Sequence, residues 1–412
     1  MWSLDSRVPK SFLKGTHRTA APEATLARAR ALMPLVGVTR VSDVTGLDCI
    51  GVPVAMAIRP NARSLAVSPG KGLDLTAAKT SALMEAIESW HAERILLPLL
   101  LARVNEIHYR RAVVDLSRLP RRAAGELREE TSLLWIEGVD LMNGTSKWLP
   151  YEVVHTNFTL PLPTASGAFL ASSNGLASGN HPLEAIGHAL SEVIERDATT
   201  LWHALGERER DDTLIDLASV DDEDCMHVLE LFEAASVKVG VWDLTSDVGI
   251  PAFRCVVLDA QPGLGRPHLP GVGAGCHPCR AIALLRALTE AAQTRITLIA
   301  GARDDLGVAF YVRANDSGIH ERTLQRLDST KAKRDFRSIV DWPSDSLDGD
   351  LQTLLAGLKR VGVEEAVAIE LSKPEIGIPV VRVVVPGLEG IHEAPGYLGG
   401  ERYQRKLSAR QP

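Results

Sequence analysis

The sequence lacks the features that mark membrane, secreted and disulfide-rich proteins. No apolar run approaches the roughly 18 residues that a membrane-spanning helix needs, and the best candidate, residues 95–102, is far shorter. The N-terminal segment contains no apolar core typical of a signal peptide. Only 5 of the 412 residues are cysteine, and an odd number in a long chain does not suggest a disulfide framework. We therefore expect a cytoplasmic protein with reduced cysteines and no membrane segment.

Clusters of positive charge are also missing. The chain has 45 lysine and arginine residues against 52 aspartate and glutamate residues, which gives a formal net charge of −7, and no basic block occurs. A nucleic-acid-binding surface needs clustered cations to neutralise phosphates, so nucleic acid is not an expected partner. The composition, 45% hydrophobic and 24% charged, is that of an ordinary globular protein with one large or two modest domains.

What the sequence does contain is a segment that occurs three times. Residues 78–89 (AKTSALMEAIES), 185–197 (AIGHALSEVIERD) and 283–294 (ALLRALTEAAQT) share Ala-Leu, one residue, an acid, and a second acid or amide three residues later. Apolar residues recur at helical spacing in each copy, which predicts amphipathic helices. Residues three apart lie on one helix face. The resulting side-by-side pairs are Glu85 and Glu88, Glu192 and Glu195, and Glu290 and Gln293.

The recurrence of these acids favours a shared cation site. A single such pair most often lies on a solvated helix face, but a purely structural repeat would preserve apolar positions without needing acids. Carboxylates that converge in a partly buried place repel one another unless a cation holds them. Magnesium in such sites usually binds together with nucleotide phosphates. The repeat therefore predicts a magnesium and nucleotide site.

A second pattern of strand, turn and strand surrounds these helices. Gly-x-Pro runs at 51–53, 249–251 and 377–379 lie between apolar stretches, and residues 140–154 form a weaker copy with an Asn143-Gly144 hairpin turn. The predicted hairpins cover 44–67, 132–155, 238–259 and 366–386. The first three lead into glycine-containing loops, 68–72, 172–180 and 271–279, each followed by an acidic helix.

Hairpins that alternate with helices predict an α+β fold, in pseudo-repeats around a nucleotide site. Further helices are expected at 22–35, 222–235 and 350–361. We divide the chain into an N-terminal arm and helix (1–40), a main domain (41–390) and a C-terminal tail (391–412). Within these, residues 1–22 are expected to form a mobile or loosely docked arm, 303–349 a surface insertion, and the tail an extended surface segment.

Lys71 lies in a Gly-Lys-Gly run directly before the first acidic helix. A lone run of this kind is more often a turn with an exposed lysine, but glycines beside a helix N-terminus also suit a phosphate, and Ser68 could assist. The run is not a P-loop, because GxxxxGK[ST] does not occur. Cys276 and Cys279 form a CxxC pair, for which we favour a structural role over a redox or sulfur-handling role. A zinc site would need a second pair.

The segments SPGKGLDLTAAKTSALMEAIESWHAE, SSNGLASGNHPLEAIGHALSEVIERDA and GAGCHPCRAIALLRALTEAAQTRITLIAGARDD resemble the YcaO family, over roughly residues 40–390. The resemblance implies a YcaO-like fold that binds ATP and Mg²⁺ and activates the backbone amide of a peptide. A nucleophile adds to the amide carbonyl, and the resulting oxyanion takes the γ-phosphoryl group of ATP. A neighbouring Cys, Ser or Thr side chain would give an azoline, and external sulfide would give a thioamide.

The resemblance also implies a role for each matching residue. The implied magnesium ligands are Glu85, Glu88, Glu184, Glu192, Glu195 and Glu290. The implied nucleotide-binding residues are Ser68, Lys71, Asn180, Glu184, Arg196, Arg286 and Gln293, of which Arg196 and Arg286 would act catalytically on the phosphates. Ser89 stands where many family members have arginine, so a phosphate contact at that position is not expected.

Three short segments bear on which reaction type the resemblance implies. Azoline-forming members commonly end in a proline-rich PxPxP tail, whereas this chain ends in LSARQP. The runs at 386–390 (PGLEG) and 299–305 (IAGARDD) resemble members that are paired with a TfuA protein and make thioamides. We favour thioamide formation on a peptide or protein substrate, with a TfuA-like partner that delivers it. An azoline-forming enzyme and a non-catalytic accessory protein remain alternatives, and a homo-oligomer is compatible with the sequence.

Overall fold

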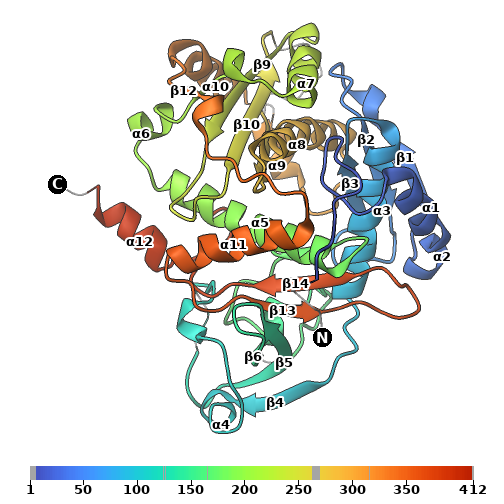
Figure 1. Ribbon diagram of the computed structural model, residues 1–412, viewed down its shortest axis with the longest axis vertical. Coiled ribbons are helices and arrows are strands. Elements are labelled where there is room, and N and C mark those ends of the chain that lie inside the picture. Colours follow the sequence, from blue (N-terminus) through green and yellow to red (C-terminus); the bar gives the residue numbers. More distant parts are fainter. Residues whose placement is uncertain are drawn as a thin grey trace.

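The computed structural model describes residues 6–123, 125, 127–164, 166–261, 270–314 and 316–410. The described strands form two small sheets of order β1-β2-β3 and β11-β10-β9, a short β12-β8 pair, and a larger sheet of order β4-β5-β13-β14-β7 with β6 paired to β5. Neighbouring strands are antiparallel except in the β12-β8 pair. Helices pack on these sheets (Figure 1), which confirms the predicted α+β class.

The two small sheets are copies of one unit. In the first, β1 (Arg40–Asp43), β2 (Val54–Ile58) and β3 (Val67–Lys71) precede α3 (Leu75–Ala92). In the second, β9 (Val237–Asp243), β10 (Ala252–Asp259) and β11 (Gly271–Cys276) precede α8 (Arg280–Ala300). Each unit therefore consists of a hairpin, a third strand that pairs with it, and an acidic helix that packs on that third strand.

The prediction that glycine-rich segments 68–72 and 271–279 are loops is wrong, because both contain a strand. Glycine occurs there because the strand runs against its own helix. A Cβ atom at Gly70 would collide with the backbone nitrogen of Ala82 on α3, and one at Gly275 with the carbonyl oxygen of Ala283 on α8. Only a residue without a side chain allows this approach.

The third unit is assembled from distant parts of the chain. β7 (Leu176–Ser178) precedes α5 (Pro182–His203), and its sheet partner is β14 (Val380–Val384), which forms a hairpin with β13 (Val367–Glu370). The predicted hairpin 132–155, seen as β5 (Ser132–Asp140) and β6 (Ser146–Pro150), lies on the far side of β13. The hairpin, the glycine-containing segment and the helix follow one another along the chain as predicted, but the hairpin that pairs with β7 is β13–β14 and not β5–β6. The last hairpin of the chain inserts beside β7.

The remaining predicted helices occur with small shifts. Residues 22–35 form two helices and not one. α1 (Pro22–Ala31) ends at Leu32, and α2 (Met33–Val36) follows directly. The other elements are β4 (Leu99–Arg103), α4 (Val104–Ile107), α6 (Glu207–Asp211), β8 (Ile215–Asp216), α7 (Glu223–Ala234), α9 (Val308–Ala314), α10 (Ser317–Ser329), β12 (Arg334–Asp335), α11 (Leu347–Arg360) and α12 (Glu401–Ser408).

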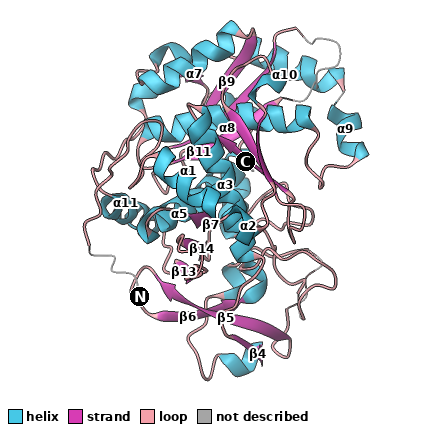
Figure 2. Cartoon of the chain, turned by 90° about the vertical axis from the view of Figure 1, so that its right-hand side faces the viewer, coloured by secondary structure: helices cyan, strands magenta, loops and turns pink. Residues whose placement is uncertain are grey.

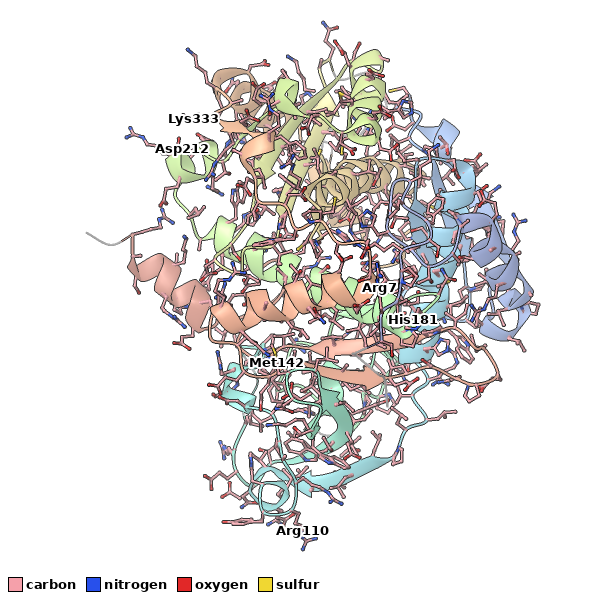
Figure 3. All side chains as sticks on the ribbon, in the orientation of Figure 1. Arg7, Arg110, Met142, His181, Asp212 and Lys333 are labelled. Atoms are coloured by element: carbon pink, nitrogen blue, oxygen red, sulfur yellow. The ribbon has the colours of Figure 1, made fainter. Side chains whose placement is uncertain are left out.

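The segment 303–349 lies partly at the outer surface, although Phe336 and Ile339 are buried. α10 lies beside β9, an edge strand of the upper sheet, in Figure 2. Lys333, just before β12, forms an ion pair with Asp212, just after α6, and both side chains point outward (Figure 3). In the described residues, no helix is both long and apolar enough to cross a membrane.

The arm is not loosely docked, contrary to the prediction for residues 1–22, where residues 6–21 are described. Lys10 lies with its amine 2.7 Å from the Asp350 carboxylate on α11, and both side chains are nearly inaccessible to solvent. Further along the arm, Thr19 donates two hydrogen bonds of 3.0 Å to Glu184 on α5. These polar contacts join segments far apart in the sequence, which is why local patterns did not reveal them.

The tail is also fixed to the molecule. Arg402 on α12 donates two 2.9 Å hydrogen bonds to the buried Asp197 on α5. Glu389, in the PGLEG run, accepts hydrogen bonds from the backbone of Gly400 (2.7 Å) and Tyr403 (2.8 Å). The expectation of an extended surface tail is therefore wrong for residues 391–410. The tail folds back and holds the middle of α5.

Candidate functional site

The helices α3, α5 and α8 meet at the centre of the molecule, between the upper and lower sheets (Figure 1). Their acidic side chains act on one another electrostatically: Glu192 on Glu85 and Glu88, and Glu290 on Glu192 and Glu195. Lys71, from β3, donates a 2.9 Å hydrogen bond to Glu290. The structure thus brings together six sequence-predicted residues, hereafter the acidic cluster: Glu85, Glu88, Glu192, Glu195, Glu290 and Lys71.

The carboxyl groups of the acidic cluster are costly to ionise together. Burial and the neighbouring Glu88 charge raise the pKa of Glu85 to about 8. Burial raises the pKa of Glu88 to about 7, and burial with the Glu290 charge does the same for Glu195. Burial alone would also raise the pKa of Glu290, but the cation of Lys71 holds it below its usual range. Additional positive charge would stabilise the ionised cluster.

The spacing of the carboxylates bears on which cation fits. Among the described residues, no three carboxylates of the acidic cluster have oxygens within 4.8 Å of one another, so they do not form a cage made of protein ligands alone. Magnesium normally takes one or two carboxylates and completes its shell with water and substrate phosphates. The cluster therefore fits Mg²⁺ bound together with a polyphosphate.

Two guanidinium groups near the acidic cluster have N–H donors that no described residue accepts from. Arg196 lies 3.7 Å from Glu192, its neighbour on α5. Arg286, on α8, donates a 2.9 Å hydrogen bond to Nε2 of His188. In the described part of the chain, Arg196 Nε, Arg286 Nε and Gln293 Oε1 are buried without a hydrogen-bond partner. Buried polar atoms normally have partners, so these point to an anionic or polar ligand.

His188, which the sequence alone does not assign to the site, contacts Arg286, a predicted phosphate-binding residue. Burial holds the pKa of His188 well below its usual range, so the imidazole is neutral. Its Nε2 therefore accepts the hydrogen bond from Arg286. The guanidinium of Arg286 is thereby oriented without having its charge neutralised. Sequence spacing could place His188 one turn before Glu192, but it could not show the contact between α5 and α8.

Glu184 and Asn180 lie beside the acidic cluster and not in it. Asn180 accepts a 3.1 Å hydrogen bond from Thr25 and donates its backbone N–H to Glu184 (3.2 Å). Glu184 also binds Thr19 and lies 3.6 Å from Arg18. A small cavity of about 30 Å³ is lined by the arm, Glu184, His188 and Arg286. The predicted ligand role of Glu184 stays a prediction, since its carboxylate is already engaged by the arm.

Three further residues around the site were not predicted from the sequence: Ser178, Arg303 and Arg382. Glu88 accepts two hydrogen bonds from Ser178 of β7, at 2.7 and 2.8 Å. Arg303, within the IAGARDD run, acts on Glu85. Arg382 on β14 acts on Glu192 and is almost wholly buried. Ser68 lies on the same strand face as Gly70, toward α3, and its role stays a prediction.

A group of two histidines and an aspartate lies beside this site. Ligand atoms of His17, His277 and Asp350 all lie within 4.8 Å of one another. However, both oxygens of Asp350 already bind Lys10. Nδ1 of His277 accepts a 2.9 Å hydrogen bond from Cys279, which leaves its proton on Nε2. This donor set suits an ion pair that anchors the arm better than a metal ion.

The CxxC pair shows no sign of activation. Cys276 is buried at the end of β11, and Cys279 occupies the N-terminal boundary of α8. Burial raises the pKa of both thiols, and the reactive form of cysteine is the thiolate. This agrees with the structural role favoured from the sequence.

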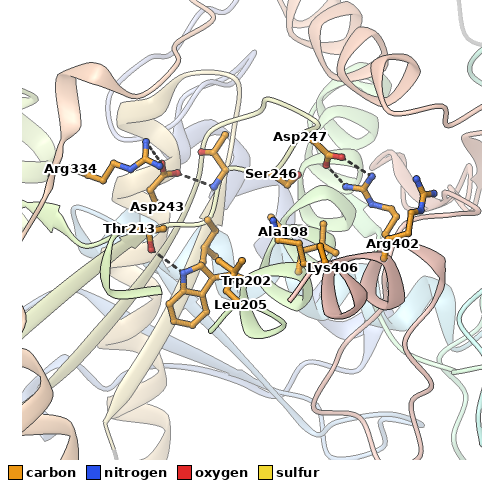
Figure 4. A pocket seen from close by; sticks show the side chains of 15 residues that line it. Ala198, Trp202, Leu205, Thr213, Asp243, Ser246, Asp247, Arg334, Arg402 and Lys406 are labelled. Carbon is orange, nitrogen blue, oxygen red and sulfur yellow. Dashed lines mark hydrogen bonds and ion pairs between the residues drawn. The ribbon is translucent and has the colours of Figure 1, made fainter. Parts of the chain in front are cut away.

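A larger cavity, of about 430 Å³, lies away from the acidic cluster. It is bounded by the C-terminal half of α5, by the loop after β9 and by α12 (Figure 4). Trp202 donates a 3.0 Å hydrogen bond to Thr213 at its floor, and Arg402 pairs with Asp247 at its rim. Among its described lining residues, this cavity contains no group of carboxylates and unpartnered donors comparable to the acidic cluster.

Comparison with known proteins identifies the family of this chain. The YcaO family, described as "YcaO cyclodehydratase" with ATP and Mg²⁺ binding, matches residues 69–389. A protein of Rhizobium leguminosarum bv. trifolii, named "Uncharacterized protein in tfuA 3'region", is 36% identical over 381 residues, covering 90% of this chain and 88% of that protein.

Two solved structures share the fold. "Heterocyclase in complex with substrate and Cofactor" matches with a TM-score of 0.79 at 24% identity, over 96% of this chain and 55% of that one. YcaO from Methanopyrus kandleri bound with AMPPCP and Mg²⁺ matches with a TM-score of 0.73 at 22% identity, over 96% and 99% of the two chains. With the family match over residues 69–389 and the 36% identical relative, the chain belongs to the YcaO family of ATP- and Mg²⁺-binding, cyclodehydratase-like enzymes.

Proposed function

We propose that this protein phosphorylates the oxygen of a peptide backbone amide with ATP and completes the reaction with external sulfide, giving a thioamide. The observation that carries the proposal is the acidic cluster with its facing guanidinium groups. Carboxylates with raised pKa values lie opposite Arg196 and Arg286, whose buried Nε atoms lack partners in the described residues. Phosphoryl transfer depends mainly on such positioning and charge stabilisation.

The proposed reaction has two steps, phosphorylation of the amide oxygen and then loss of phosphate. Hydrosulfide adds to the amide carbonyl carbon, and the carbonyl electron pair moves to oxygen. That oxygen attacks the γ-phosphorus of ATP, and ADP leaves. The S–H proton is then lost, the carbon–sulfur double bond forms, and the carbon–oxygen bond breaks to release inorganic phosphate. The amide oxygen ends in phosphate.

Different residues would bind the metal ion and the phosphates. The acids of α3, α5 and α8 would hold Mg²⁺, which supplies charge neutralisation at the phosphates. Arg196 and Arg286 would bind phosphoryl oxygens with the planar geometry of guanidinium. Lys71 would reach a phosphate by leaving Glu290, from which it is 2.9 Å away. Gln293, with its unpartnered Oε1, would position a ligand or a water.

Thioamide formation is favoured over azoline formation by two features. The 36% identical relative is named for the tfuA 3' region, which supports a TfuA-like partner. The runs at 386–390 (PGLEG) and 299–305 (IAGARDD) resemble members that are paired with a TfuA protein. Azoline formation remains the second candidate, because a structural neighbour is named a heterocyclase. A non-catalytic accessory role is less favoured, since the ionisable residues of the site are all present.

The test uses the full chain with Mg²⁺, ATP, sulfide, a TfuA-like partner and a pooled library of short synthetic peptides. Mass spectrometry should find peptides whose mass has risen by the difference between sulfur and oxygen. A mass lowered by one water would replace thioamide by azoline formation. No modified peptide and no peptide-dependent ATP turnover would refute amide activation.

A further inference from the structure

A long irregular segment, residues 154–175, leads from the helical turn after β6 (Tyr151–Val153) to β7. Residue 165 lies outside the described residues. Irregular segments of this length in a compact domain are usually functional. One end of the segment is hydrogen-bonded to Arg382 on β14, and the other end lies within reach of its charge, so Arg382 marks a meeting point of the two ends. Arg382 donates a 2.8 Å hydrogen bond to the carbonyl oxygen of Ser172 and pairs in register with Leu176. At the other end, its charge acts on the buried His155.

Several polar atoms of Arg382 and of the two ends of the segment are buried and unused. In the part of the chain that the structure describes, Nε and Nη1 of Arg382, Nε2 of His155, Oγ1 of Thr156 and Oδ1 of Asn174 have no hydrogen-bond partner. Arg382, His155 and Thr156 are only 2–3% exposed. A buried polar atom left unpartnered costs about 1–3 kcal/mol. Unpartnered atoms on Arg382 and on both segment ends therefore point to a polar ligand.

These atoms offer the complement of an amide. Nδ1 of His155 accepts a 3.1 Å hydrogen bond from Asn157, which leaves the proton of the neutral ring on Nε2 as a donor. Arg382 and His155 therefore present N–H donors, whereas Oδ1 of Asn174 is an acceptor. A backbone amide needs donors for its carbonyl oxygen and an acceptor for its N–H. A phosphate would need donors only.

The meeting point also adjoins the acidic cluster. The charge of Arg382 acts on Glu192, and β7, which follows Asn174, ends at Ser178, whose N–H and hydroxyl bind Glu88. A carbonyl held by Arg382 would therefore lie next to the carboxylates assigned to Mg²⁺. The cations assigned to phosphates, Lys71 and Arg286, come from other elements, β3 and α8.

Exposed apolar side chains follow Thr156 along the same segment. Phe158, Leu160 and Leu162 are 43%, 85% and 43% exposed. Side chains of a peptide on either side of the held amide could pack there.

We propose that Arg382, with His155 and Asn174, binds and orients the peptide amide whose oxygen is phosphorylated. Arg382 and His155 donate to the carbonyl oxygen, and Asn174 accepts from the amide N–H. Donors placed on this oxygen also stabilise the negative charge it gains when a nucleophile adds. The proposal rests on the proposed function and deepens it, because it assigns the peptide subsite to residues outside the acidic cluster.

Arg382→Lys and His155→Asn test this assignment, with Arg326→Lys on α10 as a matched control far from the site. The full chain is immobilised with Mg²⁺ and ATP, and retention of the pooled peptide library is measured together with turnover. Each variant should lower retention and raise the peptide KM about ten- to hundredfold, the effect of one hydrogen bond to a charged group. Calorimetry should show unchanged affinity for Mg²⁺-ATP.

The outcomes are separable. Weaker Mg²⁺-ATP binding with an unchanged peptide KM would make Arg382 a phosphate ligand and overturn the proposal, as would unchanged values in both assays. A lowered melting temperature of Arg382→Lys would indicate a change in the fold, and His155→Asn, which removes the Nε2 donor without removing a charge, then decides. Peptides that are retained by the wild type in an Arg382-dependent way but never modified would refute the proposed function and leave this subsite standing.

Discussion

At the residue scale, the site consists of charges that the protein itself does not fully pair. Arg286 meets a neutral histidine, His188, and no carboxylate accepts from it among the hydrogen bonds of the described residues. Glu85 and Glu88 carry pKa values near or above neutrality. Such groups destabilise a fold unless a ligand compensates them. The pairing that is missing within the protein is what Mg²⁺ and a polyphosphate would supply.

We predict that Glu192→Gln and Glu88→Gln weaken Mg²⁺-ATP binding at least tenfold, because an amide cannot neutralise a cation that the remaining phosphate charge needs. Titration calorimetry with and without Mg²⁺ measures this. Glu230→Gln, on the exposed face of α7, is the control and should bind as the wild type does. Wild-type affinity in both site variants would remove these acids from the metal site.

We predict that Arg286→Lys retains the fold but lowers kcat by about ten- to a thousandfold, the range seen when one donor to a developing negative charge is lost. Lysine keeps the charge but loses the planar pair of donors. Steady-state kinetics and a thermal melt should show slow turnover at a wild-type melting temperature. Full turnover would mean that Arg286 serves the contact between α5 and α8 only.

At the element scale, the three acidic helices could be predicted, but β3 and β11, the strands directly before two of them, could not. Apolar and acidic spacing over residues 78–89, 185–197 and 283–294 located α3, α5 and α8. The glycines before two of these helices were taken as loop residues, because local patterns cannot show that a strand will touch a helix backbone. The hairpin 366–386 was also identified, but its insertion beside β7 depends on pairing across about half the chain.

We predict that Gly273→Ala destabilises the protein by about 1–3 kcal/mol, the usual cost of overpacking. Its new Cβ would collide with the backbone of α8 at Ala287 and Ala291. Urea unfolding measures the change. Gly187→Ala on α5 is the matched control: no atom lies within 4 Å of its Cβ position, and alanine favours helix by up to about 1 kcal/mol. Equal stability of both variants would contradict the packing argument.

At the scale of the whole molecule, the two ends of the chain hold the helices of the site in place. The arm binds α11 through Lys10 and α5 through Thr19. The tail binds α5 through Arg402 and Asp197, one residue after Arg196. Sequence patterns could not foresee either contact, because each is a polar pair between segments more than 150 residues apart.

We predict that Arg402→Met destabilises the protein by about 3–5 kcal/mol, because it leaves the fully buried Asp197 without its cation. Arg405→Met on the same helix removes an exposed pair with Glu401 and should change stability by less than about 1 kcal/mol. Chemical unfolding of both variants makes the comparison. Equal effects would show that the tail does not fix α5 through Asp197.

The central claim is that the amide oxygen of a peptide is phosphorylated, and its most direct test is the fate of that oxygen. A peptide with heavy oxygen at the modified amide is incubated with the protein, Mg²⁺, ATP, sulfide and the TfuA-like partner, and the inorganic phosphate is analysed by mass spectrometry. The account predicts that each molecule of modified peptide yields one phosphate with the heavy oxygen. Unlabelled phosphate, released while the peptide is modified, would contradict it.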